Sequence, residues 1–281
     1  MSRIGGNLNL IIDIDGLRKI AAKIRWKILN LAHRANVAHL GSSLSTVEIL
    51  TLLYFEILKI NPKNPKDENR DRFILSKGHA AMALYSILSE KGFFTEKELE
   101  TFGKNGTILA EHPDRNIPGV ETATGSLGHG FGVGIGMALA AKIKNQDYRV
   151  YVLVSDGECN EGSVWEGAMF APMRQLDNLT VMVDFNKWQA TDRSTKVLAL
   201  EPLTDKWKSF GWEVFEADGH DFAKLKTMLE AASKVKNKPS VIVCHTTKGK
   251  GISFMEDNNN WHYRVPNEEE MAISKVELGI K

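Results

Sequence analysis

The second half of the chain alternates between short apolar runs and amphipathic helical segments. Strand-like runs occur at 149–157, 179–186, 212–219 and 239–247, and helical segments lie between them at 163–176, 203–211 and 221–235. Such an alternation forms βαβ units, whose strands lie parallel in a sheet that is covered on both faces. The sequence therefore predicts an α/β fold, with a parallel sheet and helices on both faces.

The first half and the C-terminus contain further elements. Apolar residues at helical spacing predict a helix over 14–34, and a loop over 35–44 follows it. Ser45 and Glu48 match a capping box ahead of an apolar helix over 46–58. The remaining elements are a strand, turn and helix within 72–92, a glycine-rich start to a helix within 128–146, and a short amphipathic helix within 266–281. With no repeat and no low-complexity linker, residues 1–281 are expected to form a single domain.

Composition and charge exclude several classes of protein. The chain has 281 residues, of which 43% are hydrophobic and 25% charged, as in ordinary soluble domains. A net charge of +1 gives no electrostatic basis for binding nucleic acid or an acidic membrane surface. Two cysteines, Cys159 and Cys244, fit a reducing compartment. The apolar stretch 8–14 is interrupted by Asp13 and is too short to span a membrane. We therefore expect a cytoplasmic protein.

Two polar residues end consecutive strand-like runs. Asp156 follows the run that begins at 149, and Asn186 ends the run that begins at 179. Ligands of open α/β sheets bind at the carboxyl ends of the strands. A carboxylate and an amide oxygen at that edge, beside Gly157, suit Mg²⁺, which usually shares its coordination with phosphate oxygens. The pair therefore suggests a magnesium diphosphate site. A capping aspartate and a turn asparagine are the alternative.

A glycine-rich segment runs from Gly125 to Gly136 and contains six glycines. Its spacing does not match the dinucleotide fingerprint, and the chain has no phosphate-loop motif of the G-x-x-x-x-G-K-[ST] type. Two interpretations remain open. The backbone could lie against a ligand ring and phosphates at a helix N-terminus, or the glycines could allow close packing of helices.

Several motifs, in order along the chain, resemble a known family. "SDGECNEG" followed by "DFNKW" looks like the thiamine-diphosphate motif. "AHLGSS", "RDRFILSKGHAAMALYSIL" and "HPDRNIPGVETATGSLGHGFGVGIGMA" resemble blocks of the N-terminal, diphosphate-binding half of transketolases. The resemblance extends from about residue 20 to 265. It implies a thiamine-diphosphate-binding fold and transfer of a two-carbon glycolaldehyde unit from a ketose or its phosphate to an aldose or its phosphate.

The resemblance also assigns roles to individual residues. It implies that Mg²⁺, or Ca²⁺ or Mn²⁺ in its place, is bound by Asp156, Asn186 and the main-chain carbonyl of Trp188. The implied cofactor-binding residues are His79, Gly125, Leu127, Gly128, Asp156, Gly157, Glu158, Asn186, Lys248 and His262. The implied catalytic residues are His39, His112, His262 and Glu161; of these, His39 and His112 meet the sugar hydroxyls, and Glu161 reaches across a subunit interface. His129 and His220 are expected to be structural.

Family members continue into a second domain, which binds the aminopyrimidine and carries a catalytic glutamate. Because this chain stops at Lys281, the resemblance implies one subunit of a split transketolase, active with a pyrimidine-binding C-terminal subunit in an α2β2 heterotetramer. There are departures: "HLGSS" replaces H-P-G-A-P, Ser155 replaces a glycine, and Lys248 is also typical of deoxyxylulose-phosphate synthases. Such a synthase, the α subunit of a 2-oxoacid dehydrogenase and a non-catalytic regulatory paralogue are the alternatives.

Overall fold

A single parallel sheet organises the part of the chain that the computed structural model describes, residues 12–281. Its strands are β1 (Arg72–Leu75), β2 (Val150–Ser155), β3 (Leu179–Phe185), β4 (Glu213–Asp218) and β5 (Ser240–His245), and their order across the sheet is β1-β2-β3-β5-β4. All four pairings are parallel. The α/β prediction is confirmed, and β2 and β3, which precede Asp156 and Asn186, are direct neighbours.

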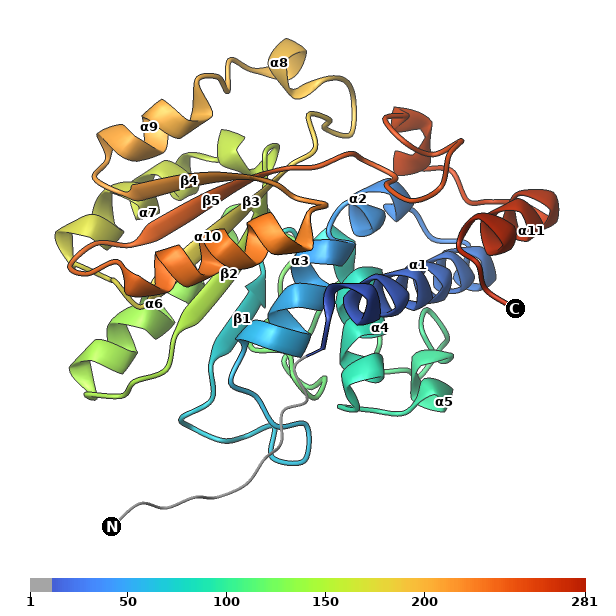
Figure 1. Ribbon diagram of the computed structural model, residues 1–281, viewed down its shortest axis with the longest axis horizontal. Coiled ribbons are helices and arrows are strands. Elements are labelled where there is room, and N and C mark those ends of the chain that lie inside the picture. The colour runs from blue at the N-terminus through green and yellow to red at the C-terminus, as the bar shows by residue number, and fades with distance from the viewer. Residues whose placement is uncertain (1–11) are drawn as a thin grey trace.

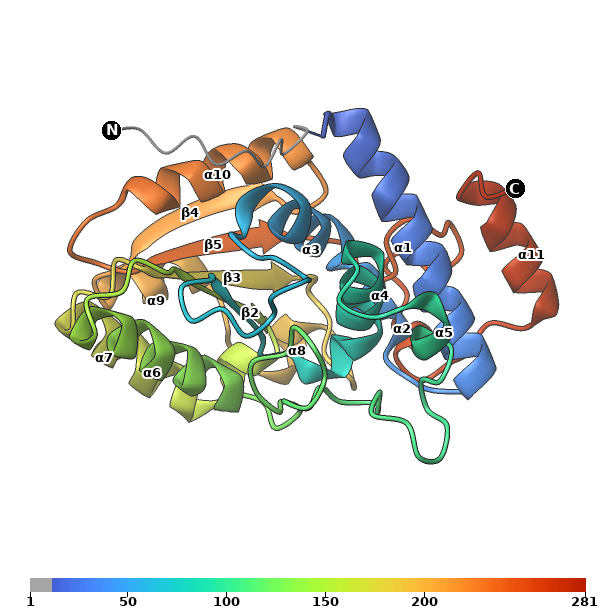
Figure 2. The ribbon, with the colours of Figure 1, turned by 90° about the horizontal axis from the view of Figure 1, so that it is seen from below.

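Helices cover both faces of the sheet (Figures 1 and 2). One layer contains α1 (Ile14–Ala35), α3 (Val47–Leu52), α4 (Ala81–Lys91) and α10 (Phe222–Lys234), and the other contains α6 (His129–Ile143), α7 (Gly162–Met173) and α9 (Leu203–Ser209). Alternate residues of one strand face different layers: Tyr151 and Leu153 pack in the first core, whereas Val150 and Val152 pack in the second. Strands buried on both faces explain the continuous apolar runs.

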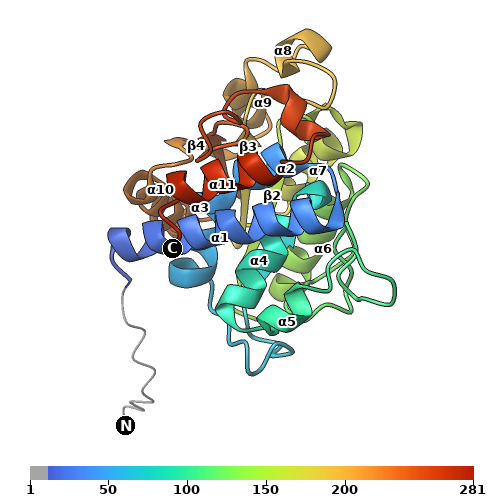
Figure 3. The same ribbon diagram turned by 90° about the vertical axis from the view of Figure 1, so that its right-hand side faces the viewer.

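Short elements complete the fold. They are α2 (Leu40–Leu44), a π-helical turn at Leu53–Ile57, α5 (Glu96–Leu99), α8 (Ser194–Val197), α11 (Glu268–Glu277), and 3-10 turns at Gly78–Ala80, Glu158–Asn160 and Asn259–His262. The predicted C-terminal helix is confirmed as α11, which begins at a capping box formed by Asn267 and Glu270 and lies beside α1 (Figure 3). The loop predicted over 35–44 contains α2, which follows His39 in a left-handed backbone conformation.

The predicted capping box at Ser45 and Glu48 is wrong. Thr46 precedes α3 and makes no side-chain cap. The Ser45 hydroxyl instead donates to the Asp184 carboxylate at 2.7 Å, and the Glu48 carboxylate accepts from the Arg25 guanidinium at 2.7 Å. Both side chains are buried, so long-range polar partners are available that outcompete a local cap.

The described residues pack around this one sheet; residues 1–11 of the predicted single domain lie outside the described part, as does most of the apolar stretch 8–14. Among the helices of residues 12–281, none combines the length and the apolar character needed to cross a membrane. The two cysteines are both buried and unpaired.

Candidate functional site

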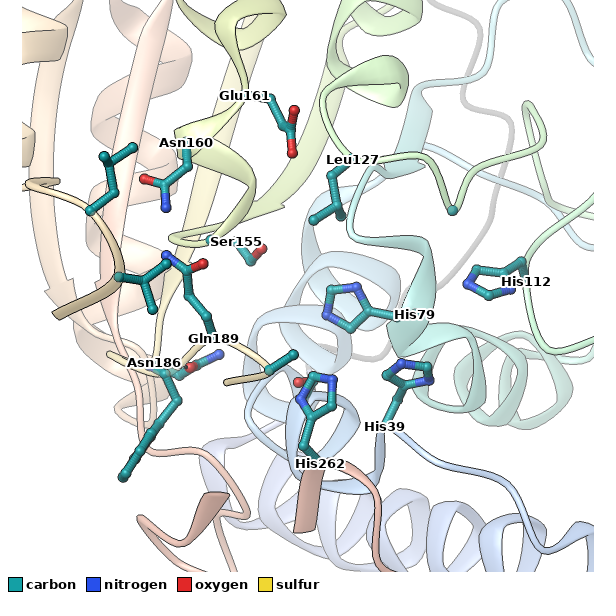
Figure 4. A pocket seen from close by; sticks show the side chains of 17 residues that line it. His39, His79, His112, Leu127, Ser155, Asn160, Glu161, Asn186, Gln189 and His262 are labelled. Atoms are coloured by element: carbon teal, nitrogen blue, oxygen red, sulfur yellow. Dashed lines mark hydrogen bonds between the residues drawn. The ribbon is translucent and has the colours of Figure 1, made fainter. Parts of the chain in front are cut away.

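A cavity of about 540 Å³ opens at the carboxyl ends of β2 and β3 (Figure 4). Ser155 ends β2 and Asn186 follows β3, so the parallel register delivers both residues to the same edge. The lining residues are His39, Ser42, His79, His112, Gly125, Leu127, Ser155, Gly157, Asn160, Glu161, Asn186, Trp188, Gln189, Ala190, Val197, Leu198 and His262. The cavity therefore unites segments that lie far apart in sequence.

Asp156, Asn186 and Trp188, here called the carboxylate wall, occupy one side. Asp156 is fully buried, and its carboxylate accepts from the Gly157 N–H at 2.8 Å, the Lys187 N–H at 2.8 Å and the Ser194 hydroxyl at 2.7 Å. Burial raises the pKa of Asp156 to about 7, and the neighbouring Asp184 carboxylate adds to the rise. Asp156 does not cap α7, since Glu161 holds that position. The alternative of a capping aspartate is therefore wrong.

Asn186 and Trp188 are held in place by neighbouring side chains. The Asn186 amide donates to the Asp184 carboxylate at 3.0 Å, which leaves its oxygen to accept from the Trp188 N–H at 3.0 Å. The Trp188 indole donates to Asp257 at 2.8 Å, and the Arg193 guanidinium lies 3.8 Å from the centre of the Trp188 ring while pairing with the same Asp257. The turn that carries the Trp188 carbonyl is thus fixed from two sides.

The donor set of the carboxylate wall fits a magnesium ion. A carboxylate offers about four acceptor positions, and Asp156 uses three; an amide oxygen offers two, and Asn186 Oδ1 uses one. Oxygen ligands of this kind are those that Mg²⁺ prefers. Gln189 lies at the same wall, with a buried amide nitrogen that has no partner within the described residues and is suited to a phosphate oxygen. Groups of three or more His, Cys, Asp or Glu side chains able to hold a metal do not occur in residues 12–281.

His39, His79, His112 and His262, here called the histidine wall, occupy the opposite side (Figure 4). The His39 ring centre lies 5.0 Å from that of His262, 5.5 Å from that of His79 and 6.3 Å from that of His112. Burial, aided by nearby cations, holds the pKa of His39 below its ordinary value and that of His79 well below it, and lowers the pKa of His262 to about 3. These three rings are therefore neutral at neutral pH.

Close backbone contacts explain part of the glycine-rich segment. A Cβ atom on Gly78 would lie 2.6 Å from the Gly125 nitrogen, and one on Gly125 would lie 2.7 Å from the His112 ring. Gly125 and Gly128 also have positive φ angles, 147° and 80°. In the helix that follows, a Cβ on Gly134 would meet Val152 of β2 at 2.4 Å, so this glycine allows α6 to pack closely against the sheet rather than against another helix. Close packing therefore accounts for Gly134, and the interpretation that the backbone at Gly125 and Gly128 lies against a bound ligand stays a prediction.

Four predicted cofactor-binding residues do not line the cavity: Gly128, Asp156, Glu158 and Lys248. The Glu158 carboxylate accepts from the Gly128 N–H at 2.8 Å and from the Ser76 hydroxyl, so its contacts support the glycine-rich loop. Burial raises the pKa of Glu158 to about 7. Lys248 is fully buried and directs its ammonium at His262 Nδ1, 3.0 Å away, rather than at the cavity. The other predicted site residues line the cavity.

A buried ion pair below the site was not predicted from the sequence. Lys77 and Asp184 are both fully buried and pair with each other, and Asp184 also accepts from the hydroxyls of Ser45 and Thr246. Burial opposes ionisation of Asp184, yet Lys77 and these donors hold its pKa below the ordinary value. The sequence did contain a signal for this ion pair, because Asp184 is a charged residue inside the apolar run of β3 and a buried charge needs a partner. The pair orients Asn186 through the Asp184 carboxylate.

Residues 17–281 match the family described as "Transketolase, thiamine diphosphate binding domain". The chain therefore belongs to the transketolase family, a family of transferases whose cofactor is thiamine diphosphate, and it corresponds to the domain that binds this cofactor. The resemblance inferred from the motifs is confirmed.

Relatives of similar length are named as subunits. A relative from Phocaeicola vulgatus, named as a subunit of apulose-4-phosphate transketolase, is 40% identical over 94% of this chain and 95% of its own length. The 6-deoxy-6-sulfo-D-fructose transketolase subunit SqwG of a Clostridium species is 42% identical, covering 93% and 96%. A crystal structure of transketolase from Campylobacter jejuni superposes with a TM-score of 0.91 at 31% identity, over 96% of this chain but only 43% of that protein. The chain thus matches whole subunits and the corresponding part of longer transketolases.

Proposed function

We propose that this chain binds thiamine diphosphate through a magnesium ion and works with a separate pyrimidine-binding chain. The assembly transfers a two-carbon ketol unit from a ketose, or its phosphate, to an aldose, or its phosphate. The observation that carries the proposal is the cavity in which the oxygen ligands of the carboxylate wall face four clustered histidines. The first group suits a metal diphosphate, and the second suits sugar hydroxyls and their protons.

In this proposal each wall has its own task. Asp156, Asn186 and the Trp188 carbonyl hold the metal, and the Gly157 N–H and Gln189 amide lie where a diphosphate would be bound. His39 and His112 bind the hydroxyls of the sugar and move their protons, which neutral imidazoles can do near pH 7. Bound thiamine diphosphate supplies the nucleophilic carbon and the electron sink for cleavage of the ketose carbon–carbon bond.

A partner chain is proposed because an acid is needed that the described residues do not place in the cavity. Among the described residues that line it, Glu161 is the only acid, and it is exposed at the N-terminus of α7. We assign Glu161 to the subunit interface and the catalytic glutamate to the partner. The subunit names of the two relatives support a separate partner. Two copies of each chain, with two cofactors, form the proposed assembly.

The test is reconstitution with the chain that co-purifies from the native source. The purified chain, given Mg²⁺ and thiamine diphosphate, should transfer no ketol unit from apulose 4-phosphate, 6-deoxy-6-sulfo-D-fructose or D-xylulose 5-phosphate to an aldose phosphate. Addition of the partner should restore transfer from at least one donor. Robust transfer by the chain alone, with contaminating partner excluded by mass spectrometry, would overturn the split-subunit proposal. Decarboxylation of a 2-oxoacid in place of ketol transfer would overturn the reaction.

A further inference from the structure

Lys248 is a fully buried lysine whose ammonium contacts no carboxylate of residues 12–281. It lies in the loop after β5, and its Nζ is 2.6 Å from Asn259 Oδ1, 3.0 Å from His262 Nδ1 and 3.4 Å from the Gln189 carbonyl oxygen. The other buried lysine near the cavity, Lys77, has Asp184 as a counter-ion. An ammonium that is buried among neutral groups is costly, so a function for Lys248 is expected.

The hydrogen-bond inventory fixes the direction of each contact. An ammonium has three donors and no acceptor, and the three partners of Lys248 use all three donors. The Asn259 amide is oriented independently, because its nitrogen donates to the Ala190 carbonyl at 3.1 Å and its oxygen must therefore face Lys248. His262 Nδ1 is thus left to accept the remaining N–H.

The backbone around Lys248 is built to hold this position. A Cβ atom on Gly41 would lie 3.0 Å from Lys248 Cγ, so the side chain runs close along the backbone of α2. Gly249 has a φ of 78° and donates its N–H to the Gly41 carbonyl at 3.0 Å. The His262 carbonyl accepts from the His39 N–H at 2.7 Å, which ties the same turn to the histidine wall. The ammonium and the imidazole are therefore fixed relative to one another.

We infer that Lys248 is a positioning residue that holds His262 as the neutral tautomer with its proton on Nε2. The hydrogen bond made by one ring nitrogen decides the state of the other, and His262 lines the cavity (Figure 4). His262 thereby becomes a fixed hydrogen-bond donor to an oxygen atom of a bound ligand, and neither of its nitrogens is free to accept a proton. Among the four histidines of the wall, this one serves recognition rather than proton transfer.

The oxygen atom that His262 would serve belongs either to the cofactor diphosphate or to the sugar, and this part of the inference rests on the proposed function. The assignment of the His262 tautomer does not rest on the proposed function, because it follows from the hydrogen bonds of Lys248 within the chain. The spectroscopic test below therefore stands whether or not ketol transfer is observed, and the kinetic test separates the two oxygen sources.

The direct test is ¹⁵N NMR of the full-length chain with labelled histidine, with His262 assigned by comparison with His262→Gln. We expect the shift of a protonated nitrogen at Nε2 and of an unprotonated nitrogen at Nδ1. In Lys248→Met the two nitrogens should move towards the averaged shifts of exchanging tautomers. Lys250→Met is the matched control, because Lys250 lies in the same loop, is partly exposed and pairs with Glu256; it should leave the His262 signals unchanged. A proton on Nδ1 of the wild-type ring, a measurement that needs no variant to fold, would overturn the inference.

The second test uses the assembled holoenzyme. In metal sites, loss of a residue that orients a metal-binding histidine typically lowers metal affinity or activity about 10- to 100-fold. For Lys248→Met we expect about a tenfold change in either the affinity for thiamine diphosphate or the ketose KM. A weaker affinity for thiamine diphosphate with an unchanged ketose KM would assign the Nε2–H to the diphosphate. A raised ketose KM with unchanged cofactor affinity would assign it to the sugar. If neither quantity changes in a folded Lys248→Met variant whose His262 tautomer is altered, the functional part of the inference is wrong.

Discussion

The carboxylate wall and the histidine wall face the same cavity but are built differently. Asp156 and Asn186 follow two adjacent strands, β2 and β3, whose register brings them to one edge of the sheet, and Trp188 lies in the turn that follows Asn186. The four histidines come from four separate segments: the start of α2, the turn before α4, the loop at 112 and the turn at 259–262. One wall is a product of sheet geometry, and the other depends on how helices and loops pack above it.

The two walls also differ in how they carry charge. Burial raises the pKa of Asp156 to about 7, so this wall changes its charge near physiological pH. Burial lowers the pKa of His39, His79 and His262, so these three rings stay neutral there. The cavity therefore combines a side that can change its charge, the proposed metal site, with a side that stays uncharged, and changes to each side should affect different measured quantities.

The largest effect is expected from Asp156→Ala. Removing the carboxylate should weaken Mg²⁺-dependent binding of thiamine diphosphate by more than about 100-fold. Loss of a side chain that only hydrogen-bonds to a metal ligand already lowers metal affinity or activity about 10- to 100-fold, and loss of the ligand itself should cost more. Calorimetry with the partner chain present measures this affinity, and circular dichroism verifies the fold. Asp147→Ala, at an exposed position, is the control and should bind normally. Unchanged affinity in Asp156→Ala would remove the carboxylate wall from the metal site.

A smaller effect on a different quantity is expected from His112→Ala. The variant should lower kcat/KM for ketol transfer by about 100-fold, the scale of a lost acid–base group, while cofactor affinity stays nearly normal. His245→Ala is the control, since His245 pairs with Glu216 and does not line the cavity. Equal losses of turnover and cofactor affinity would assign His112 to the cofactor, and wild-type kinetics would make it structural.

The smallest effect is a pH dependence that should come from the carboxylate wall alone. In the proposed site Mg²⁺ would bind the ionised form of Asp156, and burial raises the pKa of Asp156 to about 7. Affinity should therefore be constant above pH 7 and fall about tenfold for each pH unit below it, because binding must then release one proton. Calorimetry between about pH 5.5 and 8, corrected for the pH dependence of free Mg²⁺–cofactor association, measures this slope. A flat profile would show that the two walls do not differ in this way.

The sequence predicted the sheet and the position of its functional edge from local patterns. Apolar runs separated by helical segments defined four of the five strands, and a fifth was expected within 72–92, where β1 lies. Asp156 and Asn186 could be placed at one edge because parallel strands share their carboxyl ends. Local patterns failed at Ser45 and Glu48, where a capping motif was outcompeted by distant buried partners, Asp184 and Arg25.

The histidines could be selected from the sequence only through the family resemblance. A histidine carries no local pattern that distinguishes His39 from His129, yet the first lines the cavity and the second lies on the exposed face of α6. Local patterns also could not identify the partner of Lys77, because its counter-ion Asp184 is far away in sequence. Nor could they identify the contact of Lys248 with His262, since the resemblance placed Lys248 against the cofactor.

The fold class, the family and the strand ends that carry the proposed metal ligands could all be predicted from the amino-acid sequence, because each of them shows in short-range periodicity or in ordered motifs. Which polar groups meet was settled by tertiary packing. Packing placed Lys77 against Asp184, gathered four histidines within one cavity, and set the ammonium of Lys248 against the Nδ1 atom of His262. Hydrogen bonds and charges in a buried site depend on distances of a few ångströms between segments, and these distances exist only once the layers have packed.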